Sequence, residues 1–176
     1  MSVIDSYGRQ ISYLRLSVTD RCNLCCQYCV PETSGSKWSG RRLLSYTDLH
    51  RIARQSALLG IRKIRVTGGE PLVRPGIVEF LQRISALAGI QELVLTTNGT
   101  RLKRMAHPLR EAGVKRLNIS LDSLRPDVFY AITGGGDLGA VLTGIAQAER
   151  AGFPPPRINV VILRGVNDQE IGRAHV

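Results

Sequence analysis

Four cysteines lie within one short stretch of the chain, from Cys22 to Cys29. Three of them, Cys22, Cys26 and Cys29, have the spacing C-x3-C-x2-C. Three thiolates on one loop can hold three irons of a [4Fe–4S] cube and leave the fourth iron open to a small molecule. The alternative is a zinc site, which needs four nitrogen or sulfur ligands. Cys25 directly abuts Cys26, a poor geometry for a tetrahedral site, so we expect Cys25 to be a small buried side chain rather than a ligand.

Polar residues and glycines follow other apolar runs. Gly68-Gly69-Glu70-Pro71 comes after one run, where the glycines would let a ligand approach the backbone and Glu70 could bind an amino group. An ordinary strand-to-helix turn is the alternative. Ser120 and Asp122 close another run and share a face with Asn118. These three side chains are either solvent-facing or contact a ligand.

Three arginines, Arg15, Arg65 and Arg157, lie on or beside predicted strands, where surface arginines are less expected. Arg65 comes two residues before Thr67 and shares its face in a regular strand. If the three arginines converge near one opening, they would suit a polyphosphate through charge-assisted hydrogen bonds. Tyr28, between the last two cysteines, could stack on an adenine, contact a ligand through its backbone, or simply pack.

Short apolar runs alternate with amphipathic helical segments along the whole chain. We expect five strands, at 13–19, 63–67, 93–97, 117–121 and 158–163. We expect helices at 47–59, 76–87, 102–112, 126–132 and 141–151. This alternation predicts parallel strands with right-handed crossovers and favours part of a TIM-like (βα) barrel, with a doubly wound open sheet as the alternative. Either fold places functional sites at the carboxyl ends of the strands, where the unusual motifs fall.

The net charge is +10 and comes mostly from 20 arginines, against 4 lysines. These arginines are scattered, and Arg41–Arg42 is the only adjacent pair of arginines. This distribution favours a solvated basic surface over a polyanion patch, so we expect no nucleic-acid partner. No run approaches 18 apolar residues, and Met1 to Gln10 lacks the apolar core of a signal peptide. We therefore expect a cytoplasmic protein with no membrane partner.

Residues 15–32, RLSVTDRCNLCCQYCVPE, resemble the cluster loop of the molybdenum cofactor biosynthesis protein A family, the GTP 3′,8-cyclases of the radical S-adenosylmethionine (SAM) superfamily. Further stretches resemble that family in order and spacing: 65–71, 96–99, 118–123, 131–134 and 157–160. The resemblance runs from about residue 5 to 170. The cysteine spacing marks the superfamily, and the narrower resemblance depends on Arg15, Asp20, Pro31–Glu32 and 118–123.

The resemblance implies a role for ten residues. They are the cluster ligands Cys22, Cys26 and Cys29, the SAM contacts Tyr28, Gly69 and Ser120, and the GTP contacts Arg15, Arg65, Thr96 and Arg157. The family has a lysine where this chain has Arg157. The charge is kept, but a guanidinium group is bulkier and presents forked donors.

The implied cofactors are a [4Fe–4S] cluster and SAM. SAM would chelate the open iron, and an electron from the cluster would split it to give a 5′-deoxyadenosyl radical. That radical would take the 3′ hydrogen of GTP, and the ribose carbon would then attack guanine C8. The protein would supply position and a dry cavity. An electron donor of flavodoxin or ferredoxin type and a homodimer of the full-length protein are further implications. A peptide-modifying or heme-pathway radical SAM enzyme is the alternative, and a zinc-binding nucleic-acid module is a more distant one.

We expect one partial barrel domain over residues 1–170, ending before the last barrel strand. The family's C-terminal portion carries a second three-cysteine cluster, and no cysteine follows Cys29 here. We therefore expect this chain alone not to complete cyclisation. One back-translation of residues 170–176, GAG ATC GGA AGA GCA CAC GTC, matches the start of a common sequencing adapter whose next codon in frame is a stop. Residues 171–176 are therefore predicted to be a non-native tail, in which Arg173 and His175 are not native residues.

Overall fold

Five parallel strands form one sheet in the computed structural model, which describes residues 3–29 and 43–172. They lie side by side in chain order: β3 (Tyr13–Ser17), β4 (Lys63–Thr67), β5 (Glu92–Thr97), β6 (Arg116–Ser120) and β7 (Arg157–Asn159). A doubly wound sheet reverses its strand order at a switch point, whereas a barrel adds each strand beside the last. The unbroken order therefore confirms the predicted partial (βα) barrel and argues against the doubly wound alternative.

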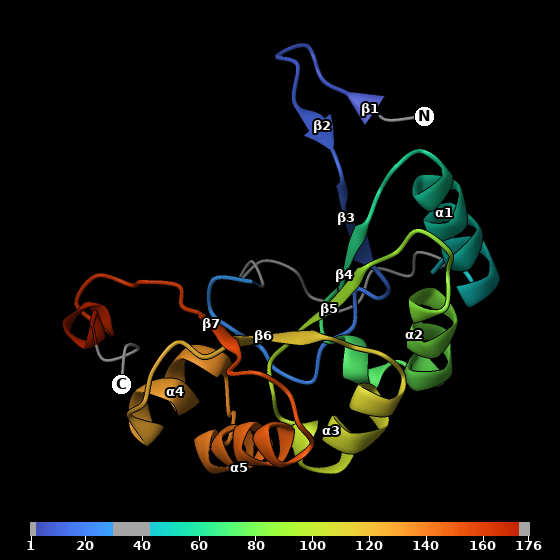
Figure 1. Ribbon diagram of the computed structural model, residues 1–176. Helices are drawn as coiled ribbons and strands as arrows, with labels where there is room; N and C mark the ends of the chain where they lie inside the picture. Colours follow the sequence, from blue (N-terminus) through green and yellow to red (C-terminus); the bar gives the residue numbers. More distant parts are fainter. Residues whose placement is uncertain (1–2, 30–42, 173–176) are drawn as a thin grey trace.

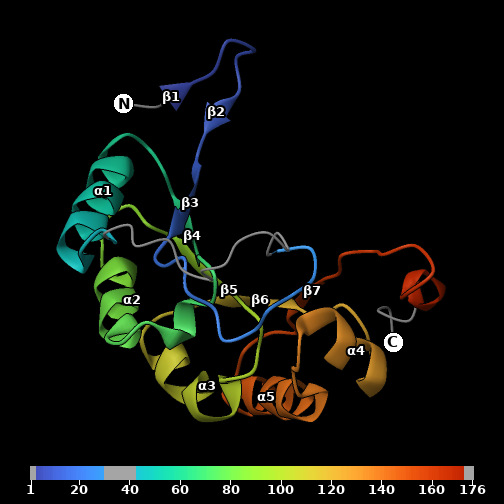
Figure 2. The same ribbon diagram turned by 180° about the vertical axis from the view of Figure 1, so that it is seen from behind.

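Helices connect successive strands and lie along the outer side of the curved sheet (Figures 1 and 2). They are α1 (Tyr46–Leu58), α2 (Ile77–Ser85), α3 (Leu102–Glu111), α4 (Pro126–Thr133) and α5 (Leu138–Arg150). Two short 3-10 turns, η1 (Pro71–Val73) and η2 (Asp168–Glu170), follow β4 and β7. Consecutive helices pack on one another, α1 on α2, α2 on α3, and α5 on both α3 and α4. The helical layer thus leaves the inner face of the sheet for other contacts.

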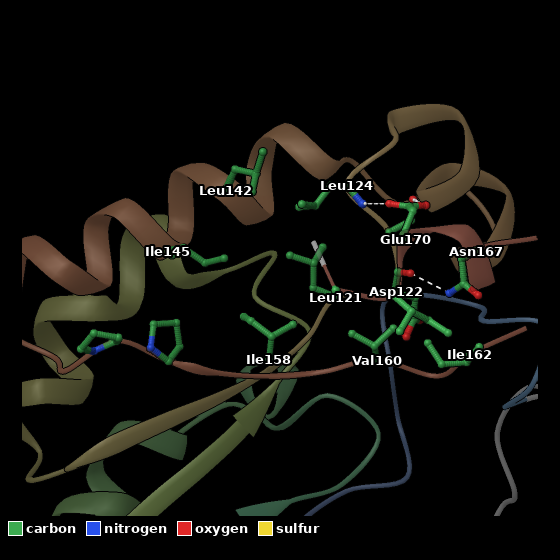
Figure 3. Close-up of a pocket in the computed structure, with 15 residues that line it drawn as sticks. Leu121, Asp122, Leu124, Leu142, Ile145, Ile158, Val160, Ile162, Asn167 and Glu170 are labelled. Atoms are coloured by element: carbon green, nitrogen blue, oxygen red, sulfur yellow. Dashed lines mark hydrogen bonds between the residues drawn. The ribbon is translucent and has the colours of Figure 1, made fainter. Parts of the chain in front are cut away.

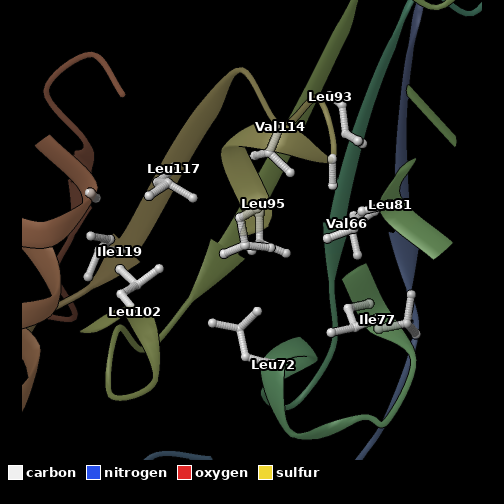
Figure 4. Close-up of a cluster of buried hydrophobic side chains, with 14 of the residues drawn as sticks. Val66, Leu72, Ile77, Leu81, Leu93, Leu95, Leu102, Val114, Leu117 and Ile119 are labelled. Atoms are coloured by element: carbon white, nitrogen blue, oxygen red, sulfur yellow. The ribbon is translucent and has the colours of Figure 1, made fainter. Parts of the chain in front are cut away.

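The two faces of the strands differ in character. Along β4, Ile64 and Val66 are fully buried on the helix side, and Arg65 between them points to the inner face. In Figure 4, Val66 and Leu95 from neighbouring strands point into one cluster with Leu81 of α2 and Leu102 of α3. This core holds the strands in fixed register, and so it fixes where the inner-face side chains lie.

A short antiparallel hairpin precedes the sheet and was not predicted from the sequence. Its strands are β1 (Val3–Ile4) and β2 (Gln10–Ile11), and it extends away from the other elements (Figure 1). The Asp5 carboxylate holds the turn by accepting hydrogen bonds from the Tyr7 and Arg9 amides, both 2.9 Å, and from Arg9 Nε at 2.7 Å.

The strand predicted at 158–163 is wrong in length, because β7 ends at Asn159. Beyond that point side chains take over the backbone hydrogen bonds. The Val161 amide donates to Asp122 Oδ1 at 2.9 Å, and the Leu163 amide donates to Asn167 Oδ1 at 2.7 Å. Asn167 Nδ2 in turn donates to the Val161 carbonyl at 2.9 Å. These bonds replace the ladder that a longer strand would need.

The remaining predicted boundaries agree with the structure to within a few residues. The helix predicted at 47–59 begins at Tyr46, and its capping residue is Ser45, whose hydroxyl accepts from the Asp48 amide at 3.1 Å. Ser45 also donates to the Asp48 carboxylate at 2.6 Å, which makes a reciprocal cap. Among the described residues, no single helix has the length and apolar character to cross a membrane. Helices α4 and α5 reach them only together, across a bend of 100°.

Candidate functional site

The loop that carries the cysteines is tied first to the end of β4. The Gly69 amide donates to the Thr19 carbonyl at 2.8 Å, and the Glu70 amide donates to the Arg21 carbonyl at 2.7 Å. A Cβ atom on Gly68 would lie 2.5 Å from the Thr19 carbonyl oxygen, and one on Gly69 would collide with the Arg21 carbonyl. The paired glycines are therefore required for the approach of the cysteine loop itself. From the sequence we expected either the approach of a ligand or an ordinary strand-to-helix turn at these glycines.

The second anchor of the loop is the carboxyl end of α4. The Cys25 amide donates to the Thr133 carbonyl and the Gln27 amide to the Ile132 carbonyl, both at 2.9 Å. Carbonyls in the last turn of a helix have no partner within the helix, so the loop satisfies them. Gly134 follows with a φ of 66°, and a Cβ there would lie 2.7 Å from the Cys25 carbonyl oxygen. Residues 131–134, noted above only for their resemblance, thus serve as the seat of the cysteine loop.

The third anchor is a hydrogen bond from the Tyr28 hydroxyl to Asp122 Oδ2, at 2.6 Å. Asp122 is 4% exposed and lies just after β6, where its other oxygen accepts the Val161 amide. Burial and the nearby carboxylate raise the pKa of Tyr28, so this phenol stays protonated and donates. Tyr28 is 39% exposed, and its contact with SAM stays a prediction.

The thiols on this loop suit a metal cluster in their chemistry. All four cysteines are free. Burial raises the pKa of Cys22 and Cys29, and burial together with the charge of Cys29 raises the pKa of Cys26 to about 11. Three thiolates here would repel one another unless bound cations compensated them, as the irons of a cluster do. Cys25 is half-buried, and its backbone amide is bonded to α4.

The same thiols do not form a site for a single ion. No group of three or more His, Cys, Asp or Glu side chains among residues 3–29 and 43–172 is placed to hold one metal ion. A [4Fe–4S] cube has a different requirement, because each thiolate binds its own iron and the sulfurs surround the cube. Three free thiols on one loop are the kind of donor set that such a cluster takes, and the assignment of Cys22, Cys26 and Cys29 as its ligands stays a prediction.

The prediction that Glu70 could bind an amino group is wrong for the described structure. Glu70 is fully buried, and its carboxylate accepts hydrogen bonds from the Leu72 amide at 2.9 Å, Thr97 Oγ1 at 2.8 Å and the Asn98 amide at 2.7 Å. Burial raises the pKa of Glu70, and these donors oppose that effect. Glu70 joins the carboxyl ends of β4 and β5 and faces no opening.

The strand register brings two of the predicted arginines side by side on the inner face. Arg15 of β3 pairs with Arg65 of β4. The Arg65 guanidinium lies 5.4 Å from the centre of the Tyr13 ring, and its Nε is buried with no hydrogen-bond partner among the described residues. A buried unpaired donor is costly, and an anion bound there would satisfy it.

A second row of inner-face side chains lies across the neighbouring strands. Thr96 of β5 pairs with Asn118 of β6, and Asn118 pairs with Arg157 of β7. Ser120 follows on the same face of β6, beside Asn159. The structure thus places Thr96, Ser120 and Arg157 on the face that carries Arg15 and Arg65. Strands β5 and β6 lie between Arg157 on β7 and the pair Arg15 and Arg65 on β3 and β4.

Two cavities lie near this region, and they differ in kind. A small one of about 370 Å³ is lined by Arg21, Cys22, Asn23, Val73 and Arg101, so it opens onto a predicted cluster ligand. A larger one of about 600 Å³ lies beyond β7 (Figure 3), where α5 side chains such as Leu142 and Ile145 lie across from Ile158. The larger cavity is mostly apolar, and among the candidate residues singled out in the sequence Asp122 lines it.

Sequence reasoning missed Asn98, which lies against Cys22, one of the predicted cluster ligands. Its Nδ2 is 3.8 Å from the Cys22 sulfur and 3.0 Å from Asn23 Oδ1. The only signal in the sequence was its place directly after a strand, within a stretch noted for resemblance. Two motif residues, Pro31 and Glu32, lie outside the described residues, as do Arg173 and His175 of the predicted tail.

Comparison with known proteins identifies the family of the chain. Residues 16–175 match the family model of the radical SAM superfamily. The chain is 63% identical over 171 residues to a GTP 3′,8-cyclase of Geobacter sulfurreducens, which covers 97% of this chain and 52% of that protein. It is 48% identical over 167 residues to a GTP 3′,8-cyclase of Alkaliphilus metalliredigens, covering 95% and 52%. The chain thus spans about half the length of the curated relatives it matches.

A solved structure supports the fold. The crystal structure of Streptococcus suis SuiB matches with a TM-score of 0.72 at 21% identity, over 93% of this chain and 36% of that protein. At this identity the likeness concerns the fold alone. The strand order, the three-cysteine loop seated on the carboxyl ends of the strands and the family match over nearly the whole chain lead to one assignment. The chain belongs to the radical SAM superfamily.

Proposed function

We propose that this chain is the SAM-binding half of a radical SAM GTP 3′,8-cyclase of molybdenum cofactor biosynthesis. The observation that carries the proposal is the adjacent pair Arg15 and Arg65 on the inner face, with a buried and unpartnered Arg65 Nε. Two neighbouring guanidinium groups are suited to a triphosphate. Relatives of 48–63% identity that carry the name GTP 3′,8-cyclase support the same substrate.

Cys22, Cys26 and Cys29 would hold a [4Fe–4S] cluster, and the three anchors of the loop would set their positions. When bound, the cluster and SAM supply the radical that abstracts a hydrogen atom from the substrate. Because the Gly69 amide is already bonded to Thr19, Gly69 would contact SAM through its carbonyl oxygen. Ser120 would contact SAM from the end of β6.

For GTP, Arg15 and Arg65 would bind the phosphates from β3 and β4. Thr96 would offer its hydroxyl from β5, and Arg157 would add a further positive charge from β7. Arg157 follows Pro155–Pro156 at the start of its short strand, so its guanidinium group is carried by a restrained backbone. The protein would thus neutralise the triphosphate on one side and bring the ribose toward the cluster loop.

Binding of GTP to the anaerobically reconstituted chain tests the proposal. Arg65→Ala and Arg15→Ala should each weaken GTP binding by roughly ten- to a hundred-fold, since a hydrogen bond to a charged group contributes about 1.5–3 kcal/mol. Arg54→Ala is the matched control, because Arg54 is exposed on α1 and its loss changes the net charge equally. Equal affinities of Arg65→Ala and Arg54→Ala for GTP would contradict the proposal.

A second outcome distinguishes the alternative radical SAM function. If a panel of peptides or a porphyrin precursor binds more tightly than GTP, the peptide-modifying or heme-pathway reading replaces the cyclase. Zinc without labile sulfide in the purified chain would favour the zinc-binding module. The flavodoxin- or ferredoxin-type donor, the homodimer of the full-length protein, the cytoplasmic location and the inactivity of this chain alone stay predictions.

A further inference from the structure

The amide side chain of Asn98 is held in one orientation beside Cys22. Its oxygen accepts hydrogen bonds from the Thr100 amide at 3.1 Å and the Thr100 hydroxyl at 2.7 Å. The nitrogen must therefore face the other way. It has two hydrogens, and it has two partners, Asn23 Oδ1 at 3.0 Å and the Cys22 sulfur at 3.8 Å. Both hydrogens are thus assigned to the cysteine loop.

The backbone of Asn98 is fixed as firmly as its side chain. Its amide donates to Glu70 Oε2 at 2.7 Å, and the preceding Thr97 hydroxyl donates to Glu70 Oε1 at 2.8 Å. Because Glu70 is fully buried, this arrangement does not depend on solvent. The buried Glu70 carboxylate therefore sets where the Asn98 backbone, and with it the side-chain amide, lies relative to Cys22.

We propose that Asn98 is a positioning residue that tunes the cluster, by donating an N–H···S hydrogen bond to the Cys22 thiolate. The proposal rests on the cluster site of the proposed function. Hydrogen bonds to the thiolates withdraw negative charge from a cluster and are one of the terms that set its reduction potential. Reduction makes the cluster more negative, so a donor at Cys22 stabilises the reduced form and raises the potential.

The Leu24 amide is the other donor to this sulfur, at 3.4 Å. Only proline removes a backbone donor, and it would also restrict the loop, whereas a side-chain substitution removes the Asn98 donor. Among residues 3–29 and 43–172, Cys22 thus receives two donors, one from its own loop and one from the end of β5. The second makes the cluster potential depend on the docking of the loop against the sheet.

The test is an anaerobic redox titration of the reconstituted chain, followed by electron paramagnetic resonance. Asn98→Ala should lower the midpoint potential by about 59 mV, which is a tenfold change in a one-electron equilibrium. Thr100→Val keeps the Asn98 side-chain amide but removes the Thr100 hydroxyl that orients it. The midpoint potential of this variant should therefore shift in the same direction, by less. Gln27→Ala is the matched control. The Gln27 side-chain amide lies on the same loop and donates from Nε2 to the Ala131 carbonyl at 3.2 Å.

Iron and sulfide content is measured for every variant. A potential that falls in Asn98→Ala and Thr100→Val at unchanged iron content, with Gln27→Ala unaffected, supports the proposal. If Asn98→Ala loses its cluster, Thr100→Val decides, and an unshifted potential there overturns the proposal. Equal shifts in Asn98→Ala and Gln27→Ala also overturn it, because they would indicate a general effect of loosening the loop. A wild-type chain that holds no cluster would overturn the cluster site and this proposal together, whereas GTP binding has no bearing on the titration.

Discussion

Gly134 and Gly152 offer a comparison that isolates the seat of the cysteine loop. Both follow the end of a helix, α4 and α5 respectively, with φ values of 66° and 81°. Their surroundings differ. A Cβ on Gly134 would lie 2.7 Å from the Cys25 carbonyl oxygen and 2.9 Å from the Cys25 Cβ, whereas one on Gly152 would meet only Arg110 Nε, at 4.0 Å. The two substitutions to alanine therefore share the backbone strain and differ in the collision with Cys25.

The magnitude follows from these contacts. A left-handed backbone costs an alanine about 1–2 kcal/mol, so Gly152→Ala should lower the free energy of unfolding by about that amount. Gly134→Ala carries the same cost plus about 1–3 kcal/mol for overpacking, because the atoms it meets belong to backbone and Cβ rather than to the end of a flexible side chain. The loop can relieve the collision only by moving off α4. Gly134→Ala should therefore also lower the iron content after reconstitution.

Urea denaturation of the metal-free chains measures the first effect, and iron and sulfide content measures the second. We expect Gly134→Ala to lose more stability than Gly152→Ala and to be the one of the two that loses iron. Equal losses of stability, together with iron content as in the wild type, would refute the inference that α4 seats the cysteine loop.

Three further predictions concern the same region. Cys26→Ala should abolish the [4Fe–4S] cluster and Cys25→Ala should keep it, as measured by iron and sulfide content. Cluster loss in Cys25→Ala would show that the ligands are misassigned. Glu70→Gln should lower the free energy of unfolding by about 1–3 kcal/mol, because an amide nitrogen would face a buried N–H donor. A change within about 0.5 kcal/mol in urea denaturation would mean that the carboxyl is already protonated at neutral pH. Since burial raises the pKa of Cys26 to about 11, the metal-free chain should lose stability as pH rises from about 9 to 11, and Cys26→Ala should lose less. Equal slopes of unfolding free energy against pH in the two chains would count against this.

Much of the fold could be predicted because its signals are local. Strand β4 alternates polar and apolar residues, strand β5 contains an apolar run, and Gly68 and Asn98 close them, while the helices between strands end near glycines. The length of β7 could not be predicted, because the residues after Asn159 are β-branched and apolar. The strand ends because Asp122 and Asn167 accept hydrogen bonds from the Val161 and Leu163 amides. Asp122 lies far away in the sequence, and Asn167 lies outside any predicted element.

The candidate site divides in the same way. The cysteine spacing is read directly from the sequence, which also raised the convergence of Arg15, Arg65 and Arg157. The register shows that Arg15 and Arg65 are neighbours. The fate of Glu70 could not be predicted, since a carboxylate after a strand can face an opening or the interior. Only the three donors gathered around it show that it faces the interior. Asn98 was missed because an asparagine after a strand is also an ordinary turn residue.

The anchors of the cysteine loop have a consequence for the synthesis of the chain. The cysteines lie at residues 22–29, whereas the anchors described above come later in the chain, at the ends of β4, β5, β6 and α4, as far as Gly134. At about 5–20 residues per second, the three thiols would be exposed for on the order of ten seconds before their seat exists. During that interval they are open to oxidation and to stray metal ions. Loading of the cluster is therefore a late event in the life of a newly made chain, although its ligands are among the first residues to be made.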